Sequence, residues 1–106
     1  MKPENILVDE WGSLKLTDFG LSKEDFGPDD DSNTICGSPE YFFPEIIMNH
    51  SYDRTLDFYS LGVLLFELLT GLPPFYNPDE VQMQQDIVSK EVQTNQITDA
   101  CAADLI

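Results

Sequence analysis

The sequence predicts an α+β chain that is mainly α-helical and carries one small β-hairpin. Two short apolar runs near the N-terminus are separated by a turn-forming stretch, which is typical of a hairpin. Residues 55–70 give the strongest helical pattern, and Gly71 followed by Pro73-Pro74 marks its end. The motif Asn77-Pro78-Asp79-Glu80 is typical of the start of another helix.

The predicted hairpin pairs residues 6–8 with residues 13–17 across a turn at residues 9–12. Tightly connected antiparallel strands bring their outer ends together, so we expect Asn5 and Asp18 to lie side by side. An amide oxygen and a carboxylate are oxygen ligands that a hard cation prefers. Asp18-Phe19-Gly20 follows the second strand, and we expect Gly20 to allow a sharp bend there. Taken without its context, this tripeptide is typical of a simple turn.

The middle of the chain is predicted to be irregular. Residues 22–33 lack an apolar period and indicate an exposed acidic loop, without the ligand spacing of a calcium loop. Residues 34–45 contain two prolines, and the aromatic run 41–43 predicts close packing onto a core. A helical turn is expected at residues 46–50.

Three helices are expected after this segment. The helix at 55–70 is apolar on nearly all sides, which is typical of the interior of a larger structure. A second helix is expected at 78–89, and a short third helix begins at Thr98-Asp99. These elements are too few to surround the first helix, so the chain is expected to be part of a domain.

The charge is strongly negative, with 20 acidic and 5 basic residues and a net charge of -15 among 106 residues. Such a surface disfavours nucleic acids and anionic membranes, and it favours basic partners or cations. The alternative is that the acids merely solvate the surface. Two cysteines and one histidine support neither a disulfide framework nor a zinc site. With no signal-peptide pattern and no membrane-insertion segment, we expect a soluble cytoplasmic protein.

The sequence contains, in order, Lys2-Pro3-Glu4-Asn5, Asp18-Phe19-Gly20, Gly37-Ser38-Pro39-Glu40-Tyr41, Pro44-Glu45 and Asp57-Phe58-Tyr59-Ser60-Leu61-Gly62. This set of motifs resembles the eukaryotic protein kinases of the serine/threonine type. Residues 34–41 and 69–76 are most similar to the AGC group. The resemblance covers residues 1–106 and implies a partial kinase domain of the C-lobe: the end of the catalytic loop, the activation segment and the central helices. The N-lobe and the C-terminal end of the domain are expected to be absent.

The resemblance implies ATP and Mg²⁺ as cofactors and a protein serine or threonine as phosphate acceptor. Asp18 and Asn5 match the magnesium ligands and therefore the nucleotide site. Lys2 matches the catalytic-loop lysine that contacts the transferred phosphate. Ser38 matches the hydroxyl residue on the acceptor side.

Regulation and substrate choice are implied in the same way. Thr34 matches the activation-loop residue that an upstream kinase phosphorylates, and Lys23 matches a cation that receives its phosphate. Glu4 and Glu67 match acids that bind a basic residue of the protein substrate. Among structural residues, Gly20 closes the metal motif and Asp57 matches a buried acid. Glu45 matches an acid whose usual arginine partner is missing, so a costly unpaired buried carboxylate is expected.

The chain also departs from the family pattern. Phe43 replaces a small residue, and Phe58 and Tyr59 replace two tryptophans. The His-Arg-Asp triplet with the catalytic aspartate does not occur in the sequence, so we expect a kinase-type chain that is inactive alone. The alternatives are a non-catalytic interaction module that binds basic partners and an incomplete product of a longer gene.

Overall fold

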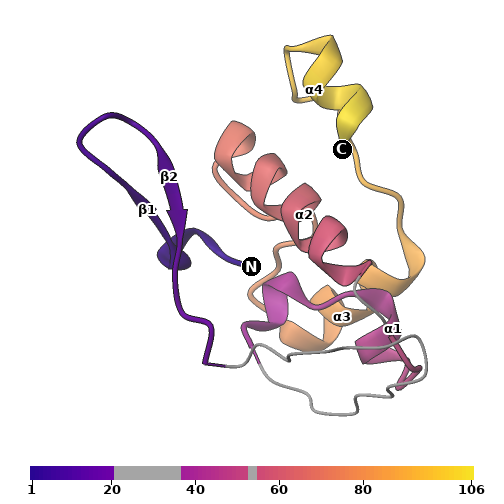
Figure 1. The fold of residues 1–106 in the computed structure, drawn as a ribbon. Coiled ribbons are helices and arrows are strands. Elements are labelled where there is room, and N and C mark those ends of the chain that lie inside the picture. Colours follow the sequence, from indigo (N-terminus) through magenta and orange to yellow (C-terminus); the bar gives the residue numbers. More distant parts are fainter. Residues whose placement is uncertain (21–36, 53–54) are drawn as a thin grey trace.

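The computed structural model describes residues 1–20, 37–52 and 55–106. Along these ranges it contains 3-10 turns η1 and η2, strands β1 and β2, and helices α1 to α4 (Figure 1). The bounds are η1 Pro3–Asn5, β1 Ile6–Val8, β2 Leu14–Leu16, η2 Pro39–Tyr41, α1 Pro44–Ile47, α2 Leu56–Thr70, α3 Glu80–Ser89 and α4 Ala100–Leu105. The predicted α+β class, mainly helical with one small hairpin, is confirmed.

Strands β1 and β2 form a two-stranded antiparallel sheet with Ile6 opposite Leu16 and Val8 opposite Leu14. These four apolar residues share one face because side chains alternate along a strand. Val8 and Leu14 are both 66% exposed, so the described residues leave the turn end of this face uncovered, whereas Ile6 at the open end is half-buried. The hairpin projects from the group of helices in Figure 1.

The turn of the hairpin is held by Asp9. Its carboxylate accepts the backbone N–H groups of Trp11 at 3.0 Å and Ser13 at 2.8 Å. Gly12 completes the turn at φ 82°, a conformation that strains residues with a Cβ. The hairpin therefore depends on local hydrogen bonds and on one glycine.

Apart from Pro73 in the loop after α2, the buried apolar side chains of the described residues lie in α1, α2, α3 and at the residue that precedes α1. They are Phe43, Ile46, Val63, Leu64, Phe66, Met83 and Ile87. Helix α3 contacts both α1 and η2. The core thus joins the segment before α1 to the helices that follow it.

Helix α2 spans almost the predicted residues, and it ends at Gly71 as expected. Gly71 adopts φ 93°, and its N–H donates to the carbonyl of Glu67 at 2.7 Å. One side of α2 is buried through Val63, Leu64 and Phe66. Other large apolar side chains remain exposed, namely Phe58, Leu61, Leu68 and Leu69. A helix that is apolar all round is therefore only half covered in this chain.

Helix α1 begins two residues before the predicted helical turn, at Pro44. The sequence prediction counted Pro44 and Glu45 as irregular because prolines interrupt helices. Proline is favoured in the first helical turn, where its missing N–H is not needed and its φ is already helical. Pro39 begins η2 for the same reason.

Helix α3 begins at Glu80 and not at the predicted Pro78, because Asp79 is its N-cap. The Asp79 carboxylate accepts the N–H groups of Val81 at 3.0 Å and Gln82 at 3.3 Å. Asp99 caps α4 in the same way through Ala102 at 2.9 Å, but α4 has no buried residue. No helix among the described residues has the length and apolar character that crossing a bilayer requires.

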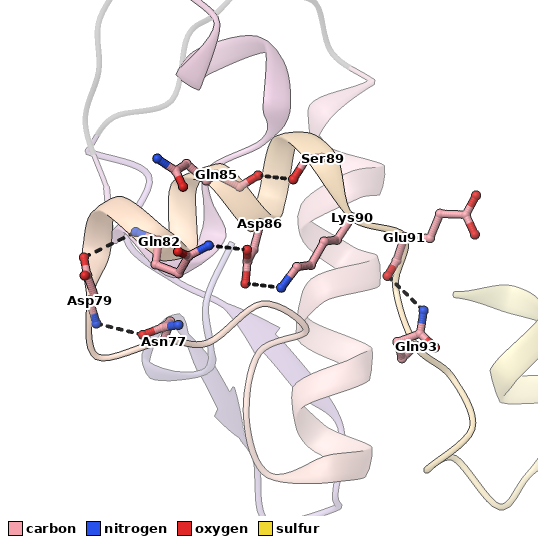
Figure 2. A network of polar contacts seen from close by, with 9 residues as sticks. All are labelled: Asn77, Asp79, Gln82, Gln85, Asp86, Ser89, Lys90, Glu91 and Gln93. Carbon is pink, nitrogen blue, oxygen red and sulfur yellow. Dashed lines mark hydrogen bonds and ion pairs between the residues drawn. The ribbon is translucent and has the colours of Figure 1, made fainter.

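Asp86 is the buried acid of α3 (Figure 2). Gln82 Nε2 donates to one of its oxygens at 2.8 Å, and Lys90 Nζ lies 2.8 Å from the other. The hydrogen bond from Lys90, and then the one from Gln82, lower the pKa of Asp86. Asp86 is therefore an ionised carboxylate whose partners are Gln82, one turn earlier in α3, and Lys90 at the C-cap of the same helix.

Candidate functional site

The structure brings together two residues that the sequence assigned to the phosphate and acceptor sides of one site. Lys2 directly precedes η1, and Ser38 directly precedes η2. The Lys2 ammonium donates to the Ser38 hydroxyl over 3.5 Å, although 36 residues separate the two positions. Both residues are half-buried. A cation and a hydroxyl group therefore meet where the N-terminal segment approaches the segment before α1.

The open end of the hairpin carries the two predicted metal ligands. The Asn5 carbonyl accepts the N–H of Thr17 at 2.8 Å and its hydroxyl at 3.1 Å. This pairing continues the β1–β2 register by one step, so Asn5 and Asp18 lie at the same end of the hairpin. The backbone hydrogen bonds of the ladder thus fix which residues meet there.

After β2, Asp18 adopts a left-handed backbone conformation, and Gly20 lies in a turn. Asp18 has φ 61°, whereas Gly20 is outside the left-handed region. Aspartate tolerates this conformation better than most residues that carry a Cβ. A Cβ at Gly20 would lie 3.4 Å from Asp18 Oδ1. Glycine at position 20 therefore gives the Asp18 carboxylate room beside the turn.

The donor set at this end fits magnesium. Asn5 and Asp18 offer oxygen atoms, and no group of three or more His, Cys, Asp or Glu side chains in the described ranges could hold a metal ion. Mg²⁺ is commonly held by one or two carboxylates and completes its shell with water and phosphate oxygens. Two oxygen ligands from the chain are consistent with that mode of binding.

A second cluster surrounds Tyr41. The Tyr41 hydroxyl of η2 donates a short hydrogen bond to Glu67 Oε2 on α2. The pKa of Tyr41 is raised well above its usual value. Burial is the largest cause, and this hydrogen bond and the charges of Glu67, Glu4 and Glu40 raise the pKa further. We call Glu4, Glu40, Tyr41 and Glu67 the acidic cluster. Its three carboxylates come from three separate elements, and Tyr41 remains a neutral donor beside them.

Sequence reasoning had assigned Glu4 and Glu67 to a substrate site, but it missed Glu40 and Tyr41. Both residues belong to a motif that the sequence singled out. The one feature that could have indicated them is Pro39, which begins the 3-10 turn η2. This turn directs the Tyr41 side chain toward Glu67 of α2. A tyrosine 26 residues from its glutamate partner gives no periodic pattern that a sequence could show.

Two residues that the resemblance assigned structural roles are exposed in this chain. Asp57, which matches a buried acid, lies exposed in the first turn of α2. Glu45 is also exposed in the first turn of α1, so the expected cost of an unpaired buried carboxylate does not arise. Both acids lie near helix N-termini, where a negative charge is favourable.

The predicted phosphorylation site, Thr34, and its cation Lys23 lie outside the described residues. Their assignment stays a prediction.

Comparison with known proteins adds evidence that does not depend on the geometry. The family model described as protein kinase domain matches residues 1–104. Serine/threonine-protein kinase Sgk2 of Homo sapiens is 46% identical over 106 residues, which are 100% of this chain and 29% of that protein. Sgk1-A of Xenopus laevis is 48% identical over 93 residues, covering 88% of the chain and 21% of the relative. Sgk1 of Rattus norvegicus is 46% identical over 100 residues, which are 94% of this chain and 23% of that protein.

The chain therefore spans between about a fifth and three tenths of the length of these relatives.

Proposed function

The chain belongs to the protein kinase domain family, and from this premise we propose that it forms the C-lobe part of a serine/threonine protein kinase. The reaction would transfer the γ-phosphate of ATP to a protein hydroxyl group. The observation that carries the proposal is the hydrogen bond between Lys2 and Ser38. These are the residues that the resemblance assigns to the phosphate and to the acceptor.

The chemistry of the pair is electrostatic. A fixed ammonium group stabilises negative charge that develops on a transferred phosphate, and partial burial strengthens this effect. The hydrogen bond to Ser38 is long at 3.5 Å, so the Lys2 ammonium loses little when it turns to an arriving phosphate. The Ser38 hydroxyl can also contact an acceptor hydroxyl of similar size and polarity. In this proposal Lys2 stabilises charge and Ser38 orients the acceptor.

ATP and Mg²⁺ are the proposed cofactors. Asn5 and Asp18 would hold the metal, which neutralises charge on the nucleotide phosphates when it is bound. The hairpin contributes by keeping the two residues at one end, through the two bonds between Thr17 and the Asn5 carbonyl.

The proposed protein substrate is basic near its acceptor residue. Support comes from the acidic cluster, since three carboxylates gather there and Tyr41 holds one of them by a hydrogen bond. A guanidinium group offers a planar fork of donors that matches a carboxylate. The net charge of -15 would attract such a peptide at long range. An upstream kinase acting on Thr34 is proposed as the activating partner.

The chain is proposed to have no transferase activity alone, because its sequence lacks the His-Arg-Asp triplet that would supply the base. Binding remains possible without the base. The same acidic cluster therefore also supports the second candidate, a non-catalytic module that captures basic partners. A cytoplasmic location is proposed as well, supported by the free, exposed thiol of Cys101.

The first test measures peptide binding to the 106-residue chain by fluorescence anisotropy. The probe is a labelled serine peptide with two arginines before the serine, and a peptide with alanines in their place is the comparison. We expect Glu67→Gln and Tyr41→Phe to weaken binding of the arginine peptide by about tenfold or more, as for a charged hydrogen bond. Glu91→Gln is the matched control, because Glu91 is exposed and lies after α3. Equal binding of both peptides would contradict the basic substrate.

The second test separates a kinase site from a simple acidic surface. Mn²⁺ is added as a paramagnetic probe, and line broadening is followed for the amides of residues 5 and 18 with and without ATP. A kinase site predicts broadening that increases with ATP and disappears in Asp18→Asn but persists in Asp104→Asn. Broadening spread over all exposed acids, with no effect of ATP, would leave the interaction module as the better proposal.

A further inference from the structure

Ser38 is followed by Pro39, and this is the only place in the sequence where a serine or threonine precedes a proline. Proline-directed protein kinases modify a hydroxyl group in this context, where the proline has no N–H that binding could leave unpaired. The backbone at Ser38 is extended, with φ -85° and ψ 128°, as expected for the residue before a proline. Ser38 therefore has both the sequence and the backbone conformation of such an acceptor.

The group that faces the Ser38 hydroxyl is the ammonium of Lys2, at 3.5 Å. Lys15 and Lys90 are each paired with a carboxylate, at 3.7 and 2.8 Å. Lys2 has no such carboxylate partner within residues 1–20, 37–52 and 55–106, and its long bond to the hydroxyl is weak. Lys2 is therefore a half-buried cation that can accept an anion.

A phosphate group on Ser38 would supply that anion. It carries about 1.5 to 2 negative charges at pH 7 and offers three acceptor oxygens. These oxygens extend beyond the hydroxyl oxygen that carries them, so the gap to Lys2 can close to a charge-assisted bond of about 2.7–2.9 Å. The carboxylates of Glu4 and Glu40 oppose the phosphate, since both act on the neighbouring Tyr41. Lys2 is the cation on which the bond would depend.

We propose that Ser38 is a phosphorylation site for a proline-directed serine kinase, and that its phosphate binds Lys2 and closes the candidate site. In the modification, the γ-phosphorus of ATP forms a bond to Ser38 Oγ and its bond to ADP breaks, while the hydroxyl proton passes to the base of the modifying kinase. The phosphate occupies the cation assigned to the transferred phosphate and removes the hydroxyl assigned to the acceptor. The inference rests on the proposed function for these two assignments.

The first test treats the 106-residue chain with ATP and a purified proline-directed kinase, and mass spectrometry of its peptides locates the phosphate. We expect Ser38 to be modified. Ser38→Thr keeps the motif and should still be modified, whereas Pro39→Ala should lose the modification. Ser51 is the internal control, because it is exposed but precedes a tyrosine and should stay unmodified.

The second test is a phosphorus NMR titration of the chain phosphorylated at Ser38. The second pKa of a free phosphoserine is about 6. The bond should lower this pKa by about one pH unit relative to the phosphorylated Lys2→Gln variant. Lys15→Gln is the matched control, because it removes the same charge from β2, where Lys15 is paired with Asp9, and should leave the pKa of the phosphate unchanged.

Closure of the site is measured by the Mn²⁺ experiment described above. Phosphorylation of Ser38 should weaken the ATP-dependent broadening at residues 5 and 18, because Lys2 is no longer available to the nucleotide phosphates. Broadening that phosphorylation leaves unchanged would contradict closure.

Two other results would overturn the proposal. The first is a chain in which the kinase leaves Ser38 unmodified, or modifies it equally in Pro39→Ala. The second is a phosphate pKa that is the same in the parent chain, Lys2→Gln and Lys15→Gln. Both readouts are independent of metal and peptide binding. If the unmodified chain shows no effect of ATP, the proposed function fails, while the titration still decides whether the phosphate binds Lys2.

Discussion

The hairpin and the helical part of the chain use their apolar residues in opposite ways. In residues 1–20 no side chain is buried, and Val8 and Leu14 are each two-thirds exposed. In α2 the side chain of Phe66 is only 2% exposed. A two-stranded hairpin is marginal in water, because it has no core to offset the cost of ordering its backbone.

This difference divides the candidate site. Asn5 and Asp18 depend on a hairpin that is held by a ladder and by the bonds of Asp9. Ser38 and Tyr41 precede Phe43, which is part of the core. We therefore expect substitutions in the core to unfold the helices and to disturb the substrate side. Substitutions in the hairpin should disturb the metal side alone.

The largest expected effect is that of Phe66→Ala. Removing this buried ring should lower the free energy of unfolding by about 3–5 kcal/mol, since a cavity remains. The measurement is urea unfolding followed by far-UV circular dichroism. Phe58→Ala removes the same ring from the exposed side of α2 and should change stability by less than about 0.5 kcal/mol. Equal effects of the two substitutions would mean that the two sides of α2 are equally covered in solution.

A smaller effect is expected from the helix caps. Asp79→Ala should destabilise the chain by about 1 kcal/mol, because two N–H groups at the start of α3 lose their acceptor. Asp99→Ala removes the same type of cap from α4, which has no buried residue. It should speed amide exchange in α4 without shifting the urea midpoint. A shift of the midpoint in Asp99→Ala would show that α4 is coupled to the core.

The elements of the chain could be predicted because their signals are local. The hairpin, the end of α2 at Gly71 and the starts of α3 and α4 each depend on residues that lie within a few positions of one another. The errors were also local in scale. Pro44 starts α1 where it was expected to prevent helix, and the left-handed conformation of Asp18 was not predicted.

The contacts of the site could not be predicted from patterns in the sequence. The bonds Lys2–Ser38 and Tyr41–Glu67 join positions 36 and 26 residues apart, so they depend on the path of the whole chain. The resemblance to kinases gave roles to Lys2, Ser38 and Glu67, but it gave no role to Tyr41. The exposure of Asp57 was missed because burial depends on which elements lie over a residue, and sequence gives only its type.

Acidification should act on the helical part through Asp86. The pKa of Asp86 is lowered from its usual value of 3.8, and the hydrogen bond from Lys90 is the largest cause. The network therefore stabilises the fold fully at pH values above 3.8. The stabilisation is then lost as the pH falls through the lowered value. The effect should be small because the Lys90 side chain is 60% exposed, where solvent screens the ion pair. Urea midpoints measured from pH 7 down to pH 2 should show the loss.

Asp86→Asn should flatten this acid dependence, whereas Asp104→Asn removes an exposed acid of α4 and should leave it unchanged. If the stability of Asp86→Asn depends on pH as strongly as that of the parent chain, carboxylates other than Asp86 cause the loss of stability in acid.

The smallest effect on the unfolding of the helices is expected from Gly12→Ala, and it separates the two regions most directly. Nothing lies within 4 Å of a Cβ at Gly12, so the only penalty is the strained φ of 82°, which costs about 1–2 kcal/mol. This strain energy is larger than the stability of an isolated two-stranded hairpin, which is marginal in water. The amides of Asp9 and Thr17 should therefore exchange faster while the urea midpoint stays constant.

Gly62→Ala is the matched control for Gly12→Ala, because a Cβ at Gly62 in α2 also meets nothing within 4 Å. Its φ is not in the left-handed region, so alanine should stabilise the helix by about 1 kcal/mol and leave the hairpin amides unchanged. Opposite responses of the two regions would show that the ends of the site unfold separately. If Gly12→Ala lowers the urea midpoint as well, the hairpin is coupled to the helices, and the Lys2–Ser38 bond is one described contact through which that coupling would pass.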